Sequence, residues 1–382
     1  MKIFYWSPFF SNIATIKAVL NSAKSLTKFE KNNKYDVSII NAIGEWNNYK
    51  EIYLKDIKFK DLSKKNWLKI MPKNGFLKSR LSYLFIFIVN IRKLLKLVND
   101  EKPDYLIIHL ITSLPIFLSP FFNKKTKIIL RLSGLPKLNT LRSLFWKIYS
   151  KNIHKVTCPT QSTFEKILES SIFNEKKICL LKDPIINIEE INKKSNQKLN
   201  SEISNEKFIL GIGRLTKQKN FTLLLNFFDK LSKKYPEYKL YILGDGEDKT
   251  TLINMINKYK LNSKVLLLGY QDNVFKYLKY ADCFILSSLW EDPGFVLAEA
   301  GIMNTNIISS DCPNGPKEII NNEDFLFMNG SSDSLLQKFL IYKSKTINEL
   351  NDQKIKVKKR IKLYTSFQHF KKLNLILNEN NE

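Results

Sequence analysis

The sequence predicts an α/β protein made of two consecutive doubly wound domains, each built on a parallel sheet. Three observations carry this prediction. The chain has 382 residues, which is too long for one compact core and suits two domains. Short, continuously apolar runs alternate with amphipathic helical stretches, as expected for parallel strands covered on both faces. A polar stretch near the middle of the chain separates two such alternating halves.

In the first half, six apolar runs are expected to form strands. They are residues 2–6, 36–42, 105–109, 127–132, 155–160 and 177–181. We assign the first domain to residues 1–185. Residues 186–206 are polar and show no strong apolar period, so they are assigned to a linker.

The alternation begins again after this polar stretch. Five strands are expected here, at residues 208–213, 239–244, 264–269, 282–288 and 306–311, with a helix at 220–234 after the first of them. We assign the second domain to residues 207–350, and residues 351–382 to a C-terminal helix and tail. Ligands of doubly wound sheets bind beyond the carboxyl ends of the strands, so the cleft between the two domains is the expected site.

The composition is globular, with a strong excess of positive charge. The chain is 44% hydrophobic and 26% charged. Lys and Arg number 62 against 36 Asp and Glu, which gives a net charge of +26. Such an excess attracts nucleic acid, an anionic membrane surface or phosphorylated substrates. Lys is the commonest residue and is spread over the whole chain, so a general compositional bias is the alternative explanation for part of this charge.

The cysteines and histidines do not indicate a metal site. Cys158, Cys179 and Cys283 lie in apolar runs and are expected to be core thiols, and no cysteine spacing matches a metal motif. With three histidines in the chain and no clustered ligands, we expect no metal or other cofactor. His154 and His369 are expected to be structural. This use of cysteine favours a reduced, cytoplasmic compartment.

Two segments bear on membranes. Residues 1–20 lack the regions of a signal peptide and are expected to form a strand, a loop and a helix. The apolar residues 105–122 contain His109 and two prolines, so a buried strand followed by a helix is favoured over a membrane span. Residues 54–97 interleave basic residues with Trp67, Phe76, Tyr83 and Phe85. This mixture suits peripheral contact with an anionic membrane, and an ordinary helix with a Lys-rich outer face is the alternative.

Three successive expected strands of the second domain end in glycine-containing loops, where a ligand can approach the backbone. Gly213 ends the first of these strands, Gly244 ends the second with Gly246 two residues later, and Gly269 ends the third. Arg214 and Lys219 lie five residues apart around a turn, so both can point at one anion. A planar guanidinium and a compact ammonium suit a diphosphate, although basic residues are common throughout this chain.

Two glutamates frame the start of an expected helix that follows the strand at 282–288. Glu291 lies before the helix and Glu299 about two turns into it, and glutamate is also ordinary near a helix start. Gly294 and Phe295 lie near the first free N–H groups, which favour an anion. Carboxylates accept paired hydrogen bonds from vicinal hydroxyls. One glutamate for each sugar, with a diphosphate between them, describes a nucleotide-sugar site.

The order and spacing of these segments resemble glycosyltransferase family 4, the retaining enzymes of the GT-B fold. The matching segments are GIGRLTKQKNF, LGDGE and EDPGFVLAEA. The resemblance covers residues 205–325 strongly and the first domain weakly. It implies two Rossmann-like domains that face each other across a cleft. It also implies transfer of a sugar from a nucleotide-sugar, here UDP-linked, to a glycan or polyprenyl-linked acceptor in surface polysaccharide, lipopolysaccharide or glycoprotein glycan synthesis.

By position, the resemblance implies that Arg214 and Lys219 hold the diphosphate. Glu291 would bind the donor sugar and Glu299 the ribose. Backbone N–H groups at the helix start would come from Gly294, Phe295 and Val296. Asp292-Pro293 replaces the family's common Gly-Phe, which leaves the shape of the sugar pocket open. Residues 310–320 resemble a variant found in members that transfer N-acetylhexosamines to lipid-linked acceptors.

The first domain departs further from the family pattern. The loop after its first strand has no glycine where the family often has two. Donors there would come from Ser7, Ser11 and Asn12. His109 resembles a histidine near the anomeric carbon in related enzymes, and a structural histidine at a strand end is the alternative. Arg131 and Gly134 are expected to face the cleft.

The expected mechanism is electrostatic. Charge on the leaving diphosphate would be stabilised by Arg214, Lys219 and the helix N-terminus, and the chain has no Asp-x-Asp motif for a metal-bound donor. His109, Arg214, Lys219 and Glu291 form the expected catalytic set. Two alternatives are a UDP-sugar epimerase of the GT-B fold and a basic, non-catalytic nucleic-acid-binding protein. The second rests on charge alone, and we expect no nucleic-acid partner.

Overall fold

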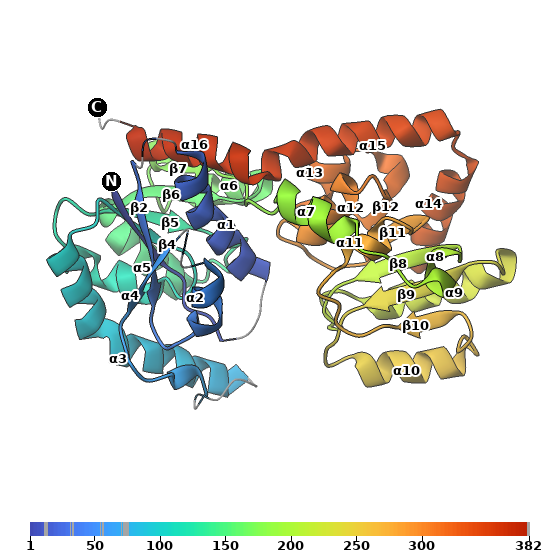
Figure 1. Ribbon diagram of the computed structural model, residues 1–382, viewed down its shortest axis with the longest axis horizontal. Helices are drawn as coiled ribbons and strands as arrows, with labels where there is room; N and C mark the ends of the chain where they lie inside the picture. Colours follow the sequence, from blue (N-terminus) through green and yellow to red (C-terminus); the bar gives the residue numbers. More distant parts are fainter. Residues whose placement is uncertain are drawn as a thin grey trace. The chain divides into compact units, whose positions relative to one another are not determined.

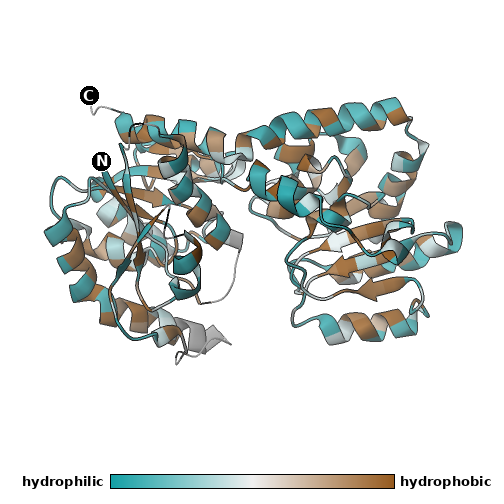
Figure 2. Cartoon of the chain, viewed as in Figure 1, coloured by the Kyte–Doolittle hydropathy of each residue, from teal (hydrophilic) through white to brown (hydrophobic). Residues whose placement is uncertain are grey.

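Two parallel sheets, each lying between helices, divide the chain into two units (Figure 1). The computed structural model describes residues 1–10, 14–30, 32, 34–53, 55, 57–69, 71 and 76–379. Unit 1 comprises Met1–Pro184 with Ser366–Glu382, and unit 2 comprises Ile185–Thr365. Figure 2 shows strands that are mostly apolar and helices of mixed polarity in both units, so the apolar helix faces pack on the sheets. The predicted α/β architecture is confirmed.

Unit 1 contains a seven-stranded parallel sheet in the order β3-β2-β1-β4-β5-β6-β7. The strands are β1 (Lys2–Trp6), β2 (Asp36–Asn41), β3 (Lys58–Asp61), β4 (Tyr105–Ile108), β5 (Lys127–Arg131), β6 (Ile153–Cys158) and β7 (Ile178–Leu180). The sequence analysis did not predict β3. This strand lies at the edge of the sheet, and none of its residues is fully buried. Its sequence, KFKD, can therefore be polar and lacks the apolar run that predicted the other strands.

Helices cover both faces of this sheet. One face carries α3 (Phe76–Glu101), α4 (Ser113–Leu118), α5 (Thr140–Tyr149) and α6 (Gln161–Glu169), and the other carries α1 (Ala14–Phe29) and α16 (Ser366–Asn378). The short α2 (Asn47–Tyr53) follows β2. Side chains alternate between the faces along each strand, so Phe4 and Trp6 pack toward α3 and α4, whereas Ile3 and Tyr5 pack toward α1.

A buried chain of hydrogen bonds fixes α16 to unit 1. His369 Nε2 lies 2.8 Å from Ser22 Oγ of α1, which lies 3.0 Å from the Tyr5 hydroxyl of β1. The other ring nitrogen, Nδ1, lies 2.8 Å from the carbonyl oxygen of Lys182. Burial lowers the pKa of His369 to about 3, so the ring is neutral in the folded protein. The last helix therefore belongs to unit 1, whereas the sequence analysis placed it in a separate C-terminal segment.

Unit 2 contains a six-stranded parallel sheet in the order β10-β9-β8-β11-β12-β13. The strands are β8 (Phe208–Ile212), β9 (Lys239–Leu243), β10 (Val265–Leu267), β11 (Cys283–Leu286), β12 (Asn306–Ser310) and β13 (Leu326–Phe327). The helices are α7 (Ile188–Ser195), α8 (Ser201–Ser204), α9 (Phe221–Lys234), α10 (Lys249–Lys258), α11 (Phe275–Leu278), α12 (Phe295–Ile302), α13 (Pro316–Ile320), α14 (Ser332–Ser344) and α15 (Ile347–Ile361). The two-residue β13 was too short to be predicted.

The polar stretch at 186–206, interpreted above as a linker, is part of unit 2. It forms α7 and α8, whose N-termini are capped by the side chains of Asn187 and Asn200. Ile191 and Leu199 are buried in the unit 2 core. Two apolar side chains are too few to create a helical period in the sequence, yet they attach the segment to the core.

In unit 2, the loops after β8 and β9 pack backbone against backbone. The amide of Leu215 donates to the carbonyl oxygen of Asp245 at 3.0 Å. A Cβ atom on Gly244 would lie 1.8 Å from the carbonyl oxygen of Gly213, and one on Gly246 would lie 2.3 Å from that of Leu215. These two glycines are therefore required by the packing of the loops, whatever they contribute to a ligand.

Gly244→Ala is expected to lower the free energy of unfolding by about 3 kcal/mol or more, because the backbone of one loop must move. Gly269→Ala is the matched control. Gly269 has a φ of +68° and open space where a Cβ would be, so alanine should cost only about 1 kcal/mol of backbone strain. Urea denaturation followed by circular dichroism measures both costs, and equal costs would contradict the packing argument.

Acidification to about pH 5 is expected to destabilise unit 1. The unfolded chain takes up a proton at His369 below a pKa of about 6.5, whereas the folded ring stays neutral down to about 3. Stability is thus complete above pH 6.5 and falls as the pH falls, by about 2 kcal/mol for one such histidine at about pH 5.

Urea unfolding followed by tryptophan fluorescence tests this pH dependence, because four of the five tryptophans lie in unit 1. His369→Gln should give a shallower loss of stability on acidification. The variant should not abolish the loss, since His109 is also buried with a lowered pKa. An unchanged slope would show that His369 is not a buried neutral group.

Candidate functional site

The strand order of the unit 2 sheet reverses between β8 and β11. The chain runs from β8 to β9 and β10 on one side, and from β11 to β12 and β13 on the other. Ligands of doubly wound sheets bind at such a reversal, beyond the carboxyl ends of the two strands. The loop after β8 carries Arg214 and Lys219, and the loop after β11 carries Glu291 and Gly294.

Lys219 and Glu291 form a buried ion pair at this reversal point. Lys219 Nζ donates to Glu291 Oε1, and Ser288 Oγ donates to the same oxygen at 2.5 Å. The side chains of Lys219 and Glu291 are only 15% and 5% exposed. Such a buried carboxylate requires a compensating charge and hydrogen bonds, which these two residues supply. The sequence analysis singled out both residues but assigned them to different parts of the donor.

Hydrogen bonds between the two loops hold the ion pair in place. Ser287 Oγ donates to the carbonyl oxygen of Lys219 at 2.8 Å. The backbone amide of Leu289 donates to the carbonyl oxygen of Gln218, also at 2.8 Å. Gln218 Nε2 donates in turn to the carbonyl oxygen of Trp290 at 2.9 Å. These supporting residues were not predicted, because polar side chains at a strand end carry no sign of which loop they will contact.

Gly294 lies three residues after Glu291 and begins the turn into α12. Its backbone is left-handed, with φ +87° and ψ +70°, a conformation that favours glycine. A Cβ atom there would lie 3.4 Å from Cγ of Glu291. The first N–H groups of α12 belong to Phe295 and Val296 and have no partner within the helix. Glu299 lies further along α12 and is half-buried.

Arg214 differs from Lys219 in being exposed to solvent. Both residues lie in the loop after β8, as predicted, but the structure places only Lys219 in contact with Glu291. Gly213 lies against the aliphatic part of Lys219, where a Cβ atom would be 3.2 Å from its side-chain carbons. This glycine therefore leaves room for the lysine stem.

Unit 1 has its own reversal point, between β1 and β4. Ser7 follows β1 and His109 follows β4, with the amide of His109 donating to the carbonyl oxygen of Trp6 at 2.9 Å. Arg131, at the end of β5, pairs in register with Thr157 of β6. Continuing the strand register places these polar residues in one row across four neighbouring strands, on the α1 face of the sheet.

This row contains buried polar atoms that have no hydrogen-bond partner. Within the described part of the chain they include Ser7 Oγ, both ring nitrogens of His109, Nε and Nη1 of Arg131, and Thr157 Oγ1. Unpaired buried polar atoms are rare in folded proteins, and a concentration of them calls for a functional explanation. Burial and the nearby charge of Arg131 hold the pKa of His109 well below its usual value, so its imidazole is neutral.

Arg131 and Gly134, which were expected to face the cleft, lie at the end of β5 and in the loop that follows it. Arg131 is buried and paired, which the sequence analysis did not predict: Nη2 donates to Asp183 Oδ1 at 2.5 Å, and both side chains are 3% exposed. The alternation along β5 turns this side chain onto the α1 face, which the sequence analysis did not consider. Gly134 is half-buried in the following loop. Ser11 and Asn12 lie outside the described residues.

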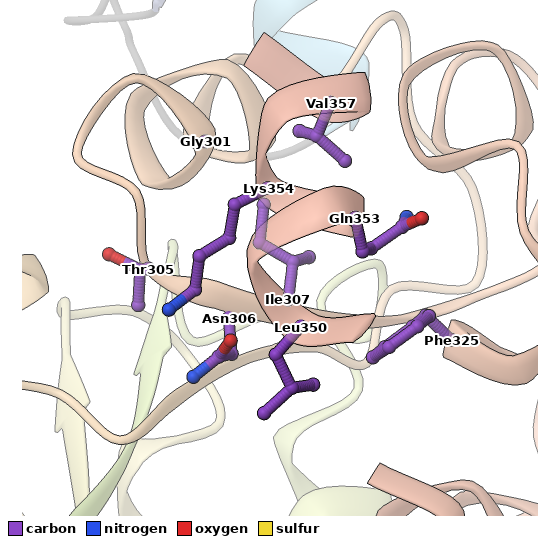
Figure 3. A pocket seen from close by; sticks show the side chains of 9 residues that line it. All are labelled: Gly301, Thr305, Asn306, Ile307, Phe325, Leu350, Gln353, Lys354 and Val357. Atoms are coloured by element: carbon purple, nitrogen blue, oxygen red, sulfur yellow. The ribbon is translucent and has the colours of Figure 1, made fainter. Parts of the chain in front are cut away.

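A small pocket in unit 2 lies away from this site. It lies where β12 begins and α15 passes over it, and Figure 3 shows the side chains that line it. They are Gly301, Thr305, Asn306, Ile307, Phe325, Leu350, Gln353, Lys354 and Val357. Asn306 starts β12, so the pocket lies toward the amino ends of the strands, whereas Lys219 and Glu291 lie beyond the carboxyl ends.

Two observations on the described part of the chain bear on metals and membranes. No group of three or more His, Cys, Asp or Glu side chains there could hold a metal ion. None of the helices described is both long and apolar enough to cross a membrane. Cys158, Cys283 and Cys312 are buried, and Cys179 is partly buried.

Comparison with known proteins identifies the second half of the chain. The family described as Glycosyl transferases group 1 matches residues 192–360. An uncharacterized glycosyltransferase of Methanocaldococcus jannaschii is 35% identical over 270 residues, covering 66% of each chain. An N-acetylgalactosaminyltransferase of Campylobacter jejuni is 27% identical over 212 residues, covering 53% of this chain and 56% of the relative. The chain thus spans less than two thirds of the length of these two relatives.

Solved structures match over nearly the whole chain. A glycosyltransferase from Rickettsia africae superimposes with a TM-score of 0.77 at 16% identity, covering 99% of both chains. HepE of Anabaena, solved in complex with UDP, gives 0.72 at 13% identity, also covering 99% of both chains. The chain therefore has the GT-B fold, and its residues 192–360 match the group 1 glycosyl transferase family.

Proposed function

We propose that the protein is a retaining, family 4 glycosyltransferase that transfers a sugar from a UDP-sugar to a glycan or polyprenyl-linked acceptor. It would act in the cytoplasm, at the inner face of the cell membrane, and without a metal ion. One observation carries the proposal: the buried pair of Lys219 and Glu291 lies at the strand-order reversal of unit 2, directly before the start of α12. A fixed cation, a carboxylate and free helix N–H groups are the partners that a sugar diphosphate needs.

The names of the relatives support the two substrates. The Campylobacter jejuni relative is named for transfer of N-acetylgalactosamine to a diphospho-undecaprenol-linked sugar. Anabaena HepE has been solved with UDP and with UDP-glucose. These names favour a UDP-linked donor and a lipid-linked glycan acceptor for this chain. They lend no support to an epimerase or to a nucleic-acid-binding protein.

The proposed roles follow from charge and position. Charge develops on the leaving diphosphate as the sugar bond breaks, and fixed positive groups that meet it lower the barrier. Arg214, which is exposed, and the N–H groups of Phe295 and Val296 would bind the diphosphate together with Lys219. Glu291, already fixed through one oxygen, would accept hydrogen bonds from the donor sugar hydroxyls. Glu299, within α12, would bind the ribose.

Unit 1 would contribute neutral polar groups to the reaction. His109 is uncharged, and both of its ring nitrogens lack partners, so one can donate and the other accept a hydrogen bond. Such a ring can bind a sugar hydroxyl near the anomeric carbon without adding charge to the transition state. This assigns charge stabilisation to unit 2 and hydroxyl recognition to unit 1.

Arg214→Ala is expected to raise the dissociation constant for UDP about 10- to 100-fold, because a charged hydrogen-bonding partner of the diphosphate is lost. In a thermal-shift assay with chelator present, UDP at about 100 times its dissociation constant should stabilise the wild type by roughly 2.7 kcal/mol, or several degrees. Arg214→Ala and Glu299→Ala should respond less at the same concentration.

Lys217→Ala is the matched control, since Lys217 is an exposed basic residue of the same loop. It should respond to UDP like the wild type. GDP and a set of UDP-sugars, tested in parallel, identify the base and the donor sugar. If no nucleotide stabilises the wild type, the donor-site proposal fails.

The two members of the ion pair have a structural role that must be separated from binding. Lys219→Ala should lower the free energy of unfolding by about 3–5 kcal/mol, because it leaves the Glu291 carboxylate buried and unpaired. The double variant Lys219→Met/Glu291→Gln removes both charges and should regain most of that stability. Urea denaturation compares the three proteins.

The double variant also isolates the functional role of the pair. It should fold and yet show at least about a 100-fold weaker affinity for the UDP-sugar that stabilises the wild type best, since both the ammonium and the carboxylate are gone. A stable double variant with wild-type affinity would restrict the pair to a structural role.

A further inference from the structure

The outer surface of the helix layer formed by α3, α4 and α5 exposes large apolar side chains. Three residues of α3 are between 55% and 62% exposed, and three of α5 are between 56% and 79% exposed. Phe121, in the turn after α4, is 61% exposed. We call this the α3–α5 surface; its apolar residues are Leu81, Leu84, Ile88, Phe121, Leu141, Leu144 and Ile148.

The spacing of these residues makes each helix present one apolar stripe. In both α3 and α5 the three residues recur at intervals of three and four, which places them on one helix face. The opposite face of α3 buries Ile86 and Leu94, and that of α5 buries Trp146, all in the core beneath. Both stripes therefore point away from the same face of the sheet.

The two stripes lie on neighbouring helices. The short helix α4 contacts both α3 and α5, so the three helices form one continuous layer over the sheet of unit 1 (Figure 1). The apolar residues of the α3–α5 surface are thus spread over one side of this unit. Single exposed apolar side chains are normal on protein surfaces, whereas seven large ones on one helix layer are typical of an interaction site.

Basic residues surround the apolar stripes. Helices α3, α4 and α5 contain seven Lys and Arg but only two acidic residues, Asp100 and Glu101. On α3 the exposed Arg92 and Lys96 continue the apolar stripe toward the C-terminus of the helix. On α5 the exposed Arg142 and Lys147 flank it. The surface therefore pairs an apolar face with a strong local excess of positive charge.

We propose that the α3–α5 surface docks unit 1 onto an anionic phospholipid bilayer. The leucine, isoleucine and phenylalanine side chains would enter the boundary between headgroups and acyl chains, while Arg and Lys contact the lipid phosphates. A polyanion such as nucleic acid would use the charge but leave the apolar side chains in water. An anionic bilayer satisfies both features at once.

This docking extends the proposed function, because it would bring unit 1 to the layer that holds a polyprenyl-linked acceptor. It does not depend on the assignment of the donor site. The residues of the α3–α5 surface are distinct from Arg214, Lys219, Glu291 and Glu299.

The test is sedimentation of the full chain with lipid vesicles. The wild type is expected to bind vesicles of phosphatidylcholine containing about 30% phosphatidylglycerol, and to bind pure phosphatidylcholine at least about tenfold more weakly. The variant Leu144→Glu/Ile148→Glu should lower partitioning onto the anionic vesicles at least about tenfold, because two apolar contacts are lost and two negative charges are added.

The matched control is Ile253→Glu/Ile355→Glu, which makes the same change at exposed isoleucines of α10 and α15 in unit 2. It should bind anionic vesicles within about threefold of the wild type, since only general charge has changed. Circular dichroism and thermal melts verify that both variants fold, as expected for exposed positions.

Two results would overturn the proposal. The first is that the wild type does not bind anionic vesicles. The second is that the α5 variant and the unit 2 control lose binding equally, which would leave only non-specific charge attraction.

Analytical ultracentrifugation tests whether a second copy of the chain covers the surface instead. A wild-type dimer that Leu144→Glu/Ile148→Glu dissociates, together with no vesicle binding, would show that the surface is a dimer interface. The UDP thermal shift of the same samples reports separately on the donor site.

Discussion

The buried carboxylate of Glu291 is the constraint on which the unit 2 site depends. A charge with so little access to water must be neutralised and hydrogen-bonded, and Lys219 and Ser288 meet both requirements at one oxygen. Other features of the site serve this pairing. The glycine at 213 leaves room for the lysine stem, and contacts between the β8 and β11 loops hold both backbones in place. Contacts within unit 2 therefore hold the charged groups of this site in position.

Both units place their unusual polar chemistry at the reversal of strand order, but with opposite character. In unit 2 the groups are charged and paired, and a helix start adds unpartnered N–H groups. In unit 1 the row around His109 is neutral overall, since the imidazole is uncharged and Arg131 is paired with Asp183. A charged site suits a diphosphate, whereas a neutral site with unpaired donors and acceptors suits hydroxyl groups. This difference in character is what the proposed sugar transfer would require of a donor site and a hydroxyl-binding site.

The net charge of +26 acquires a more specific meaning in the structure. Much of it is a general property of a Lys-rich chain, and several exposed lysines pair with nearby carboxylates at the surface. Between residues 62 and 151 acidic residues are scarce, and the same stretch exposes apolar stripes on α3 and α5. The combination of positive charge and exposed apolar side chains distinguishes the α3–α5 surface as a candidate interaction site. Either feature alone is common on protein surfaces.

The sequence by itself determined the fold class and the position of the donor-side candidates. Continuous apolar runs predicted eleven of the strands, because strands covered on both faces must be apolar. Two strands were not predicted: β3 is a polar edge strand, and β13 has only two residues. The spacing from Arg214 to Lys219 and from Glu291 to Glu299 was visible because the residues of each pair lie in one local segment. Tertiary structure alone decided which of these groups meet. It paired Lys219 with Glu291 from loops 72 residues apart, turned Arg131 inward to Asp183, and returned α16 to unit 1 through His369. Such contacts depend on strand order and side-chain direction, which local patterns do not encode.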